Sequence, residues 1–516
     1  MAGGEAQGPS DRCPASGVRR QGFLGEWLGK TAWYACREEN RHRRNLVWGV
    51  MISTQVNRRD FLKAGTVLTT GSFLVGGTRV HLLAAEPGEP ARPHSANDQI
   101  QIALIGAGQQ GQYDTGIALR VPGVKLLAAA DCYDGRLTHC KELWGKDLFT
   151  TRDYQEIITR KDIDALIIAT PDLWHKQAAL DAMNAGKDVY LEKPMIHVYS
   201  DGPEIIDTAR KTQRILQVGS QRVSSLIYKK AQQFYQAGAI GELNSVNAWW
   251  DRNYAVGAFE ASIPPDASPE TIDWPRFLGT APQIPFNPEH FFQWRKWRAY
   301  GSGVAGDLFV HLFSGTHFIT GTHGPTRAMS TGGLRFWKDG RDFPDVLMAL
   351  FDFPQGFNLY LRVNFVSGGP QTDNEGFIFT GNEGTMQIGA SGAALLSDYN
   401  RDAVTLSGMR HRPDPGYEIS SWANATQKIF LAEYKKKYHL PQPPAPPPRK
   451  ESFVAPEKYN DSYDHLKNFF EALRTRQPVV EDPVFGFRAA GAALLSNLSY
   501  EQNAPVRWDP EEMKLL

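Results

Sequence analysis

The chain has 516 residues, of which 41% are hydrophobic and 22% are charged, a composition typical of a globular enzyme with room for two or more domains. Lys and Arg together number 56, as do Asp and Glu, so the charge balance argues against a nucleic-acid-binding surface. The four cysteines have neither the spacing of zinc ligands nor the density of a disulfide scaffold.

The first recognisable signal lies at residues 57–63 (NRRDFLK), which resemble the twin-arginine export motif. The mildly apolar stretch that follows is too short for a stable membrane anchor, and Ala84-Ala85 offers a small-residue cleavage region. Because an export signal belongs near the start of a protein, we expect Met51 to be the true start. Residues 1–50 would then be a mis-called or disordered extension. The alternative is a chance Arg-Arg pair in a disordered tail.

Export by this route predicts a periplasmic protein whose partner is the twin-arginine machinery. If the signal is not used, the protein is cytoplasmic. An exported enzyme would have to hold NAD tightly, because no useful pool of free NAD exists outside the cytoplasm. We assign residues 51–98 to the signal and a Pro-rich linker, the latter at residues 86–97 (EPGEPARPHSAN).

A dinucleotide-binding pattern follows the linker. Residues 101–105 (QIALI) predict a strand, and residues 112–120 predict a helix; between them lies Gly106-Ala-Gly108-Gln109-Gln110-Gly111. The first glycine permits a tight turn, the second lets a pyrophosphate approach the backbone, and the third lets helix and strand pack closely. The phosphates would then lie at a helix N-terminus, where free N–H groups favour anions.

A second apolar strand, residues 124–130, ends at Asp131, which lies 20 residues beyond Gly111. A carboxylate at this position accepts hydrogen bonds from the ribose hydroxyls and repels a 2′-phosphate. The sequence therefore favours NAD over NADP as the cofactor. The alternative is an ordinary helix-capping or turn Asp.

A continuous apolar run, residues 164–170, predicts a buried parallel strand that leads into Thr170-Pro171-Asp-Leu-Trp174-His175. Pro171 fixes the turn where the chain leaves the sheet. His175 is a candidate contact of the nicotinamide or its ribose, with a structural His at a helix start as the alternative.

Residues 187–191 predict another strand, which leads into Glu192-Lys193-Pro194, and residues 216–219 predict the last strand of this half. Ligands of open α/β sheets bind in the crevice outside the carboxyl ends of the strands. Lys193 is therefore well placed for chemistry, and we expect Thr170, Pro171, Glu192 and Lys193 to contact the cofactor.

The second half has a β-rich pattern. An aromatic and basic segment, residues 291–298 (FFQWRKWR), predicts either a sugar-stacking wall or a packing plug between domains. Strands are predicted at residues 244–251, 346–353, 358–365 and 376–380, with a hairpin turn at Pro354-Gln-Gly356. The candidate substrate contacts are Trp174, Gln221, Arg222, Trp294 and Arg298.

These motifs, with GVAGDLFVH at residues 303–311 and the tail at residues 497–509, resemble the Gfo/Idh/MocA (glucose–fructose oxidoreductase/inositol dehydrogenase) family. The resemblance implies an α/β protein with an N-terminal Rossmann domain, residues 99–220. It also implies a C-terminal α/β domain, residues 221–516, whose large, open, mostly antiparallel sheet often forms the oligomer interface. We therefore expect a homo-oligomer, and the family's Lys-Pro peptide is commonly cis.

The resemblance makes Lys193, Asp307 and His311 the catalytic group. Asp307 and His311 are four residues apart and would share one face of a helix. We assign His311 as general base and Lys193 as the donor to the reacting oxygen, while Asp307 binds a neighbouring hydroxyl or orients His311. The alternative is a helix-terminal Asp and a buried His. No metal site is predicted, since His317 and His323 lack ligand spacing.

The later part of the chain predicts few further features. Residues 441–448 (PQPPAPPP) predict a solvated polyproline loop. Residues 462–474 and 485–500 have the apolar spacing of amphipathic helices, which we expect to pack back on the fold rather than to form a third domain.

Three functions compete. The leading hypothesis is an exported NAD-dependent oxidoreductase with tightly bound cofactor, acting on a secondary alcohol of a sugar, polyol or related carbohydrate. The alternative is an NAD-dependent glycosidase that oxidises, eliminates, adds water and reduces without net redox change, although GDLFVH is more similar to the dehydrogenases. The third is a non-catalytic sugar-binding protein, against which Lys193, Asp307 and His311 argue.

Overall fold

The computed structural model describes residues 71–75, 78–82, 99–367, 374–389, 393–396, 417–438 and 451–516. The predicted export motif, the linker at 86–97 and the proline-rich segment at 441–448 lie outside these ranges. Among the helices within them, none combines the length and apolarity needed to cross a bilayer.

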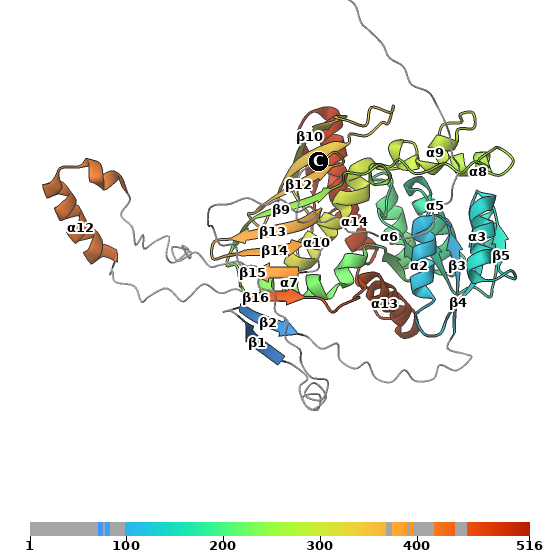
Figure 1. The fold of residues 1–516 in the computed structure, drawn as a ribbon, viewed down its shortest axis with the longest axis horizontal. Coiled ribbons are helices and arrows are strands. Elements are labelled where there is room, and N and C mark those ends of the chain that lie inside the picture. The colour runs from blue at the N-terminus through green and yellow to red at the C-terminus, as the bar shows by residue number, and fades with distance from the viewer. Residues whose placement is uncertain are drawn as a thin grey trace, which may run out of the picture. The chain divides into compact units, whose positions relative to one another are not determined.

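The first sheet has six parallel strands in the order β5-β4-β3-β6-β7-β8. Figure 1 labels three of them, β3, β4 and β5. The order reverses between β3 and β6, as in a Rossmann-type fold. All side chains of β6 and β7 are buried because helices cover both faces of the sheet. The strands are β3 (Ile100–Ile105), β4 (Val124–Ala130), β5 (Phe149–Thr151), β6 (Ala165–Ile168), β7 (Asp188–Leu191) and β8 (Leu216–Val218).

Five helices belong to this half. The helix predicted at 112–120 begins three residues earlier, at Gln109, directly after the glycine turn. The short helix α4 begins where the Asp153 side chain accepts a hydrogen bond from the Gln155 N–H. The helices are α2 (Gln109–Ala118), α3 (Asp134–Trp144), α4 (Tyr154–Ile158), α5 (Asp172–Asn184) and α6 (Asp201–Thr212).

The second sheet is larger and mixed, in the order β1-β2-β16-β15-β14-β13-β9-β12-β11-β10-β17-β18. Only the β12–β9 and β16–β2 pairs are parallel among its described pairs, so the predicted mostly antiparallel sheet is confirmed. Its strands are β1 (Gly71–Val75), β2 (Thr78–Leu82), β9 (Leu243–Asp251), β10 (Arg327–Gly333), β11 (Val346–Asp352), β12 (Asn358–Asn364), β13 (Glu375–Gly381), β14 (Thr385–Gly389), β15 (Ala393–Leu396), β16 (Glu451–Val454), β17 (Val506–Asp509) and β18 (Lys514–Leu515).

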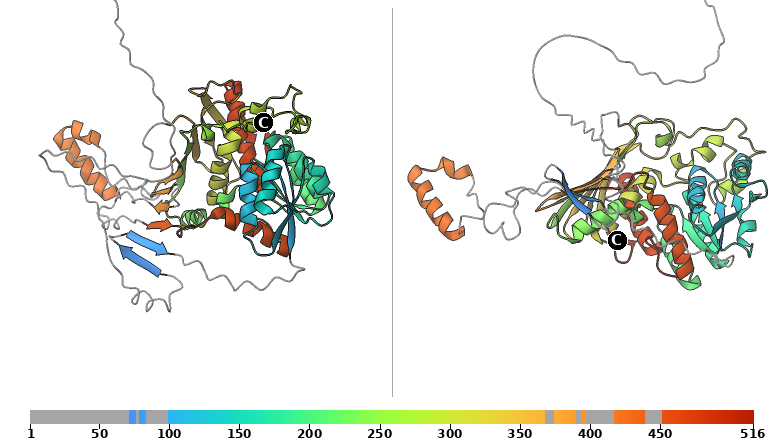
Figure 2. Two further views of the ribbon diagram at one scale, coloured as in Figure 1. Left: turned by 45° about the vertical axis from the view of Figure 1, so that its right-hand side comes forward. Right: turned by 60° about the horizontal axis from the view of Figure 1, so that its bottom comes forward.

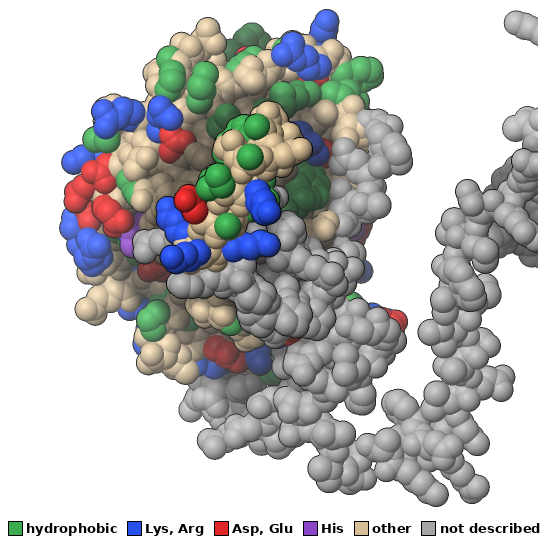
Figure 3. Space-filling view, turned by 90° about the vertical axis from the view of Figure 1, so that its left-hand side faces the viewer, with side chains coloured by type: hydrophobic (Ala, Val, Ile, Leu, Met, Phe, Trp, Pro, Cys, Tyr) green, Lys and Arg blue, Asp and Glu red, His purple; other side chains and the backbone are tan. Residues whose placement is uncertain are grey.

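One face of the second sheet packs on helices and the other is open. In β11, Leu347, Ala349 and Phe351 point into the core, while Leu350 on the opposite face is 55% exposed. Helices α10 and α14 lie between the two sheets (Figures 1 and 2). On the side of the molecule seen in Figure 3, Lys and Arg side chains are interspersed with Asp and Glu.

The remaining described helices all follow β8 in the chain. Helix α13 packs against α2, and α14 packs against α6, β8 and β10, so both pack back on the fold, as predicted. They are η2 (Gln221–Ser224), α7 (Leu226–Gln236), η3 (Val256–Ala258), α8 (Trp274–Leu278), α9 (Pro288–Phe292), η4 (Trp294–Lys296), η5 (Ala305–Phe309), α10 (Val310–Thr320), η6 (Tyr417–Ser421), α12 (Asn424–Tyr438), α13 (Asp461–Thr475) and α14 (Pro483–Gln502).

Candidate active site

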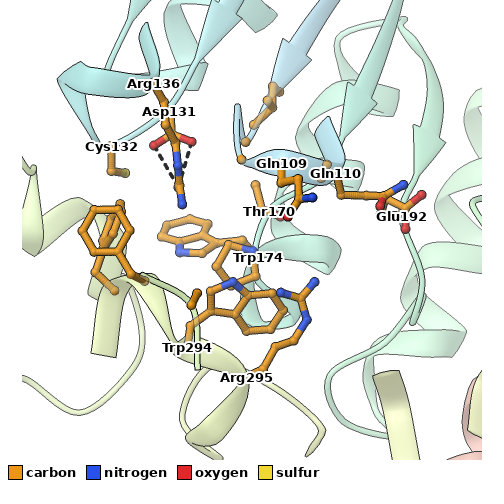
Figure 4. A pocket seen from close by; sticks show the side chains of 18 of the residues that line it. Gln109, Gln110, Asp131, Cys132, Arg136, Thr170, Trp174, Glu192, Trp294 and Arg295 are labelled. Atoms are coloured by element: carbon orange, nitrogen blue, oxygen red, sulfur yellow. Dashed lines mark hydrogen bonds and ion pairs between the residues drawn. The ribbon is translucent and has the colours of Figure 1, made fainter. Parts of the chain in front are cut away.

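A cavity of about 470 Å³ opens outside the carboxyl ends of β3, β4, β6 and β7 (Figure 4). Residues from both halves of the protein line the cavity. The crevice outside the carboxyl ends of the strands is the usual place for a ligand in this fold. The predicted site residues that line it are Gly106, Gly108, Gln109, Gln110, Asp131, Thr170, Pro171, Trp174, Glu192, Lys193, Gln221, Trp294, Asp307 and His311.

The glycine turn fits a dinucleotide. A Cβ on Gly106, whose φ is +87°, would lie 2.6 Å from the Ala169 carbonyl oxygen, and a Cβ on Gly111 would overlap the Gly106 carbonyl oxygen. Gly108 is different, because the nearest atom to a Cβ there would be 3.8 Å away. No side chain caps the N-terminus of α2 at Gly108. Open space beside uncapped backbone N–H groups is suited to a pyrophosphate.

Asp131 lies at the end of β4, as predicted, with its carboxylate facing the cavity. It accepts a hydrogen bond from the Tyr133 N–H at 2.9 Å and pairs with Arg136 Nη1 at 3.3 Å (Figure 4). The Arg136 guanidinium also stacks over the Phe291 and Phe292 rings, 5.4 Å from each ring centroid. A cation therefore stands beside the carboxylate that the sequence predicted to select NAD.

Lys193 and Asp307 meet across the two halves of the protein. Lys193 Nζ, after β7, donates to Asp307 Oδ1 and to the Asp307 carbonyl oxygen, both at 2.9 Å. Arg295 Nε is 3.3 Å from Oδ1, and Arg252 Nη1 is 3.7 Å from Oδ2. Burial alone would raise the pKa of Asp307, but these three cations hold it well below its usual range. Asp307 is therefore ionised.

His311 lies in the same cavity with its ring against Trp250, at a centroid distance of 5.1 Å. Burial, with the charges of Lys193 and Arg222, lowers its pKa well below 6.5, so the imidazole is neutral. Its Nδ1 has no hydrogen-bond partner in the described part of the chain. Asp307 lies in the π-helical turn η5 rather than in α10, and it bonds to Lys193, not to His311.

Behind Lys193, Glu192 is 5% exposed and accepts a hydrogen bond from Gln221 Nε2 at 2.7 Å. Gly219 leaves room for it, since a Cβ there would overlap Glu192 Oε1. Burial and the neighbouring Glu192 raise the pKa of Asp114 well above its usual range. The two buried carboxyl groups therefore carry at most one negative charge between them at neutral pH.

Four predicted site residues do not line the cavity. Gly111 is buried against the glycine turn. His175 is buried, with its ring nitrogens 2.7 Å from the Pro194 carbonyl oxygen and 3.0 Å from that of Thr170, so it supports the turn after β7, where the Lys193–Pro194 peptide is cis. Arg222 pairs with Glu375 and stacks on Trp250; Arg298 pairs with Glu501 and stacks on Phe343.

The aromatic segment lines the cavity with some side chains and packs into the protein with others. Trp174 and Trp294 project into the cavity (Figure 4), where Arg295 stacks over the Trp294 ring at 4.3 Å. Lys296, 1% exposed, anchors the segment through Glu260 at 2.6 Å and Asp339 at 2.9 Å. The sequence could not separate lining of the cavity from packing, because cavity-lining and buried side chains are neighbours along this short segment.

Five cavity arginines were missed: Arg136, Arg152, Arg252, Arg276 and Arg295. Arg295 could have been predicted, because it belongs to the aromatic and basic segment at residues 291–298. Arg252 could not, because it follows β9 and is brought to the site only by the fold. No group of three or more His, Cys, Asp or Glu side chains is placed to hold a metal ion within the described residues.

Two family models match consecutive parts of the chain and together cover more than half of it. The NAD-binding Rossmann fold of an oxidoreductase family matches residues 100–220, and the GFO/IDH/MocA C-terminal domain matches residues 228–387. The chain belongs to the Gfo/Idh/MocA oxidoreductase family. The predicted family and fold class are thereby confirmed, and a Gfo/Idh/MocA protein is expected to be an enzyme.

Sequence relatives of this Gfo/Idh/MocA protein include glycosyl hydrolase family 109 proteins. An α-N-acetylgalactosaminidase from Shewanella oneidensis is 29% identical over 177 residues, which is 31% of this chain and 38% of the relative. The match thus spans well under half of that relative's length.

Solved structures share the fold at low identity. Levoglucosan dehydrogenase in complex with NADH and levoglucosan has a TM-score of 0.56 at 16% identity, covering 79% of this chain and 99% of that one. Aldose-aldose oxidoreductase from Caulobacter crescentus, complexed with glycerol, has a TM-score of 0.55 at 16% identity and the same coverage.

Proposed function

We propose that the protein is an NAD-dependent oxidoreductase acting on a secondary alcohol of a sugar, polyol or related carbohydrate. The observation that carries the proposal is the contact of Lys193 with Asp307 at 2.9 Å, beside the neutral His311, in the cavity that the glycine turn also lines. NAD, when bound, supplies a hydride acceptor; the residues of the chain handle the proton and the charge.

The site can take the hydroxyl proton and stabilise the oxygen left behind. Neutral His311 accepts the proton of the reacting hydroxyl. Lys193 donates a hydrogen bond to the same oxygen and offsets its negative charge. Asp307, ionised between three cations, holds the ammonium group of Lys193 in place. Trp174 and Trp294 offer apolar faces for a sugar ring.

The second candidate is an NAD-dependent glycosidase that begins with the same oxidation and ends without net redox change. It is favoured by the similarity to the α-N-acetylgalactosaminidase. Lys193 and His311 would serve in both reactions, because both reactions begin with removal of a proton from a sugar hydroxyl. The products, not the site, distinguish the two.

The proposal includes export with tightly bound NAD. It is supported by the NRRDFLK segment at 57–63, and by Asp131 facing the cavity for the choice of NAD. An exported enzyme that kept its cofactor would have to reoxidise it in place, with a second sugar or by reversing its own oxidation.

The test begins with protein expressed from Met51 with its signal, recovered from the periplasm and denatured to release bound nucleotide. One NAD(H) per chain supports the proposal, and little or none contradicts it. The holoenzyme is then mixed with sugars, polyols and aryl glycosides. Net cofactor reduction or sugar-to-sugar exchange indicates an oxidoreductase, whereas release of the aglycone without net NADH indicates a glycosidase.

A further inference from the structure

The two ends of the cavity differ in how many carboxylates they have for each cation. At the end near Asp131, each arginine has a carboxylate of its own. Arg136 pairs with Asp131, Arg152 with Asp134, and Arg276 with both Asp153 and Asp273. These arginines are neutralised by the protein itself.

At the opposite end, three cations share one carboxylate. Lys193, Arg295 and Arg252 all contact Asp307, at 2.9, 3.3 and 3.7 Å. The neighbouring His311 is neutral, and the Glu192–Asp114 pair supplies at most one further negative charge. Arg222, the next arginine, is matched by Glu375. About one positive charge therefore stays uncompensated at the end where the reaction takes place.

The reacting oxygen needs one cation, and Lys193 supplies it. Arg295 is then left with free donors: its Nε faces Asp307, while neither terminal nitrogen has a hydrogen-bond partner within the described residues. Its side chain is 39% exposed and lies along Trp294, beside the cavity (Figure 4). Arg252 donates to the Gly257 carbonyl oxygen at 3.0 Å and stays 21% exposed. A guanidinium with two terminal nitrogens free matches a planar carboxylate.

We propose that the substrate carries a carboxylate, as a uronic acid does, and that Arg295, supported by Arg252, binds it. This inference rests on the proposed function in that it names the substrate class of the same site. A single uncompensated charge suits a carboxylate better than a dianionic phosphate ester, whose second charge would face Asp307. Trp294 beneath Arg295 would lie against the sugar ring that bears the acid.

Binding to the NAD-loaded protein tests the inference without requiring turnover. The probes are glucose, galactose and mannose, the corresponding uronates, and the corresponding 6-phosphates, measured by titration calorimetry at low and high salt. We expect at least one uronate to bind ten- to a hundred-fold more tightly than its neutral parent, with the difference shrinking at high salt. Tighter binding of the 6-phosphate or the neutral sugar, or binding of no uronate, would overturn the proposal.

Substitutions locate the charge. R295Q should remove most of the uronate preference while changing neutral-sugar binding only a few-fold, and R295K should keep part of the preference. R298Q, three residues away but outside the cavity, is the matched control and should leave the preference unchanged. Equal loss for acid and neutral sugar in R295Q would contradict the assignment. Uronate binding without cofactor reduction or bond cleavage would keep this inference and refute the proposed reaction.

Discussion

Lys193 illustrates how a single side chain acquires its role from both halves of the protein. Strand β7, which precedes Lys193, brings it to the carboxyl end of the first sheet. Asp307, 114 positions later in η5, accepts a hydrogen bond from its ammonium group. Each residue is placed by its own element, but the contact between them forms only when the two halves of the protein pack together.

We expect Lys193→Ala to lower turnover by about 10²- to 10³-fold, because the reacting oxygen would lose its charged donor. Bound NAD should stay within a few-fold of the wild-type content, since the glycine turn and Asp131 are untouched. Lys125→Ala, on an exposed position of β4, is the control. Steady-state rates with any substrate found above and the nucleotide released on denaturation provide the measurement; an unchanged rate would show that the site is wrongly assigned.

Asp131 and Arg136 form an ion pair, and we expect the balance of its two charges to set the choice between NAD and NADP. Asp131→Ala should weaken NAD binding and leave Arg136 free to attract a 2′-phosphate, so the NADP-to-NAD affinity ratio should rise by about tenfold or more. The double variant D131A/R136A, which removes both charges, should not gain NADP affinity. Dissociation constants of both nucleotides for the nucleotide-free protein decide the matter, and no change in either would refute the ribose assignment.

At the scale of elements, helix α13 has one buried histidine that hydrogen-bonds to the end of the first sheet. His465 Nε2 donates to the Val218 carbonyl oxygen at 2.8 Å, and its Nδ1 accepts from Ser224 Oγ at 2.7 Å. Burial lowers the pKa of His465 to about 4. Protonation would remove the acceptor and place a charge inside the helix packing.

This arrangement predicts acid sensitivity. The unfolded chain binds a proton at His465 near pH 6.5 and the folded chain does not, so stability falls as the pH drops from about 6.5 to about 4. The contribution of His465 to that loss is about 3 kcal/mol at pH 4. Urea unfolding across this range should show a shallower decline for His465→Gln than for the wild type, measured against His139→Gln on the surface. Parallel declines would contradict the prediction.

The elements that the sequence predicted well are those whose signal is local. Residues 165–168 are an unbroken apolar run, and Gly106 marks a turn that tolerates no side chain. The errors have the opposite origin. Arg298 was predicted to bind substrate, but its partner Glu501 is 203 positions away, and Arg222 is paired with Glu375, 153 positions away. A pattern in sequence identifies a charged side chain but not the distant carboxylate that neutralises it.

At the scale of the whole molecule, the open face of the second sheet has an apolar cluster where an oligomer interface is expected. Leu350 lies between Met329 of β10 and Tyr360 of β12, and Met329 and Leu350 are more than half exposed. If copies associate through this face, Leu350→Lys should lower the molar mass measured by light scattering. Leu143→Lys, on an exposed position of α3, should not. A monomeric wild type would refute the expected homo-oligomer.

Helices α13 and α14 carry a consequence for how the protein is made. They pack on α2, α6 and β8, although residues 461–502 are synthesised more than 240 positions after β8. The nucleotide-binding half cannot complete its packing on the ribosome until nearly all of the chain has emerged. We therefore expect the dinucleotide to be captured only after nearly the whole chain has been made, so a nascent chain stalled before residue 461 should not retain it.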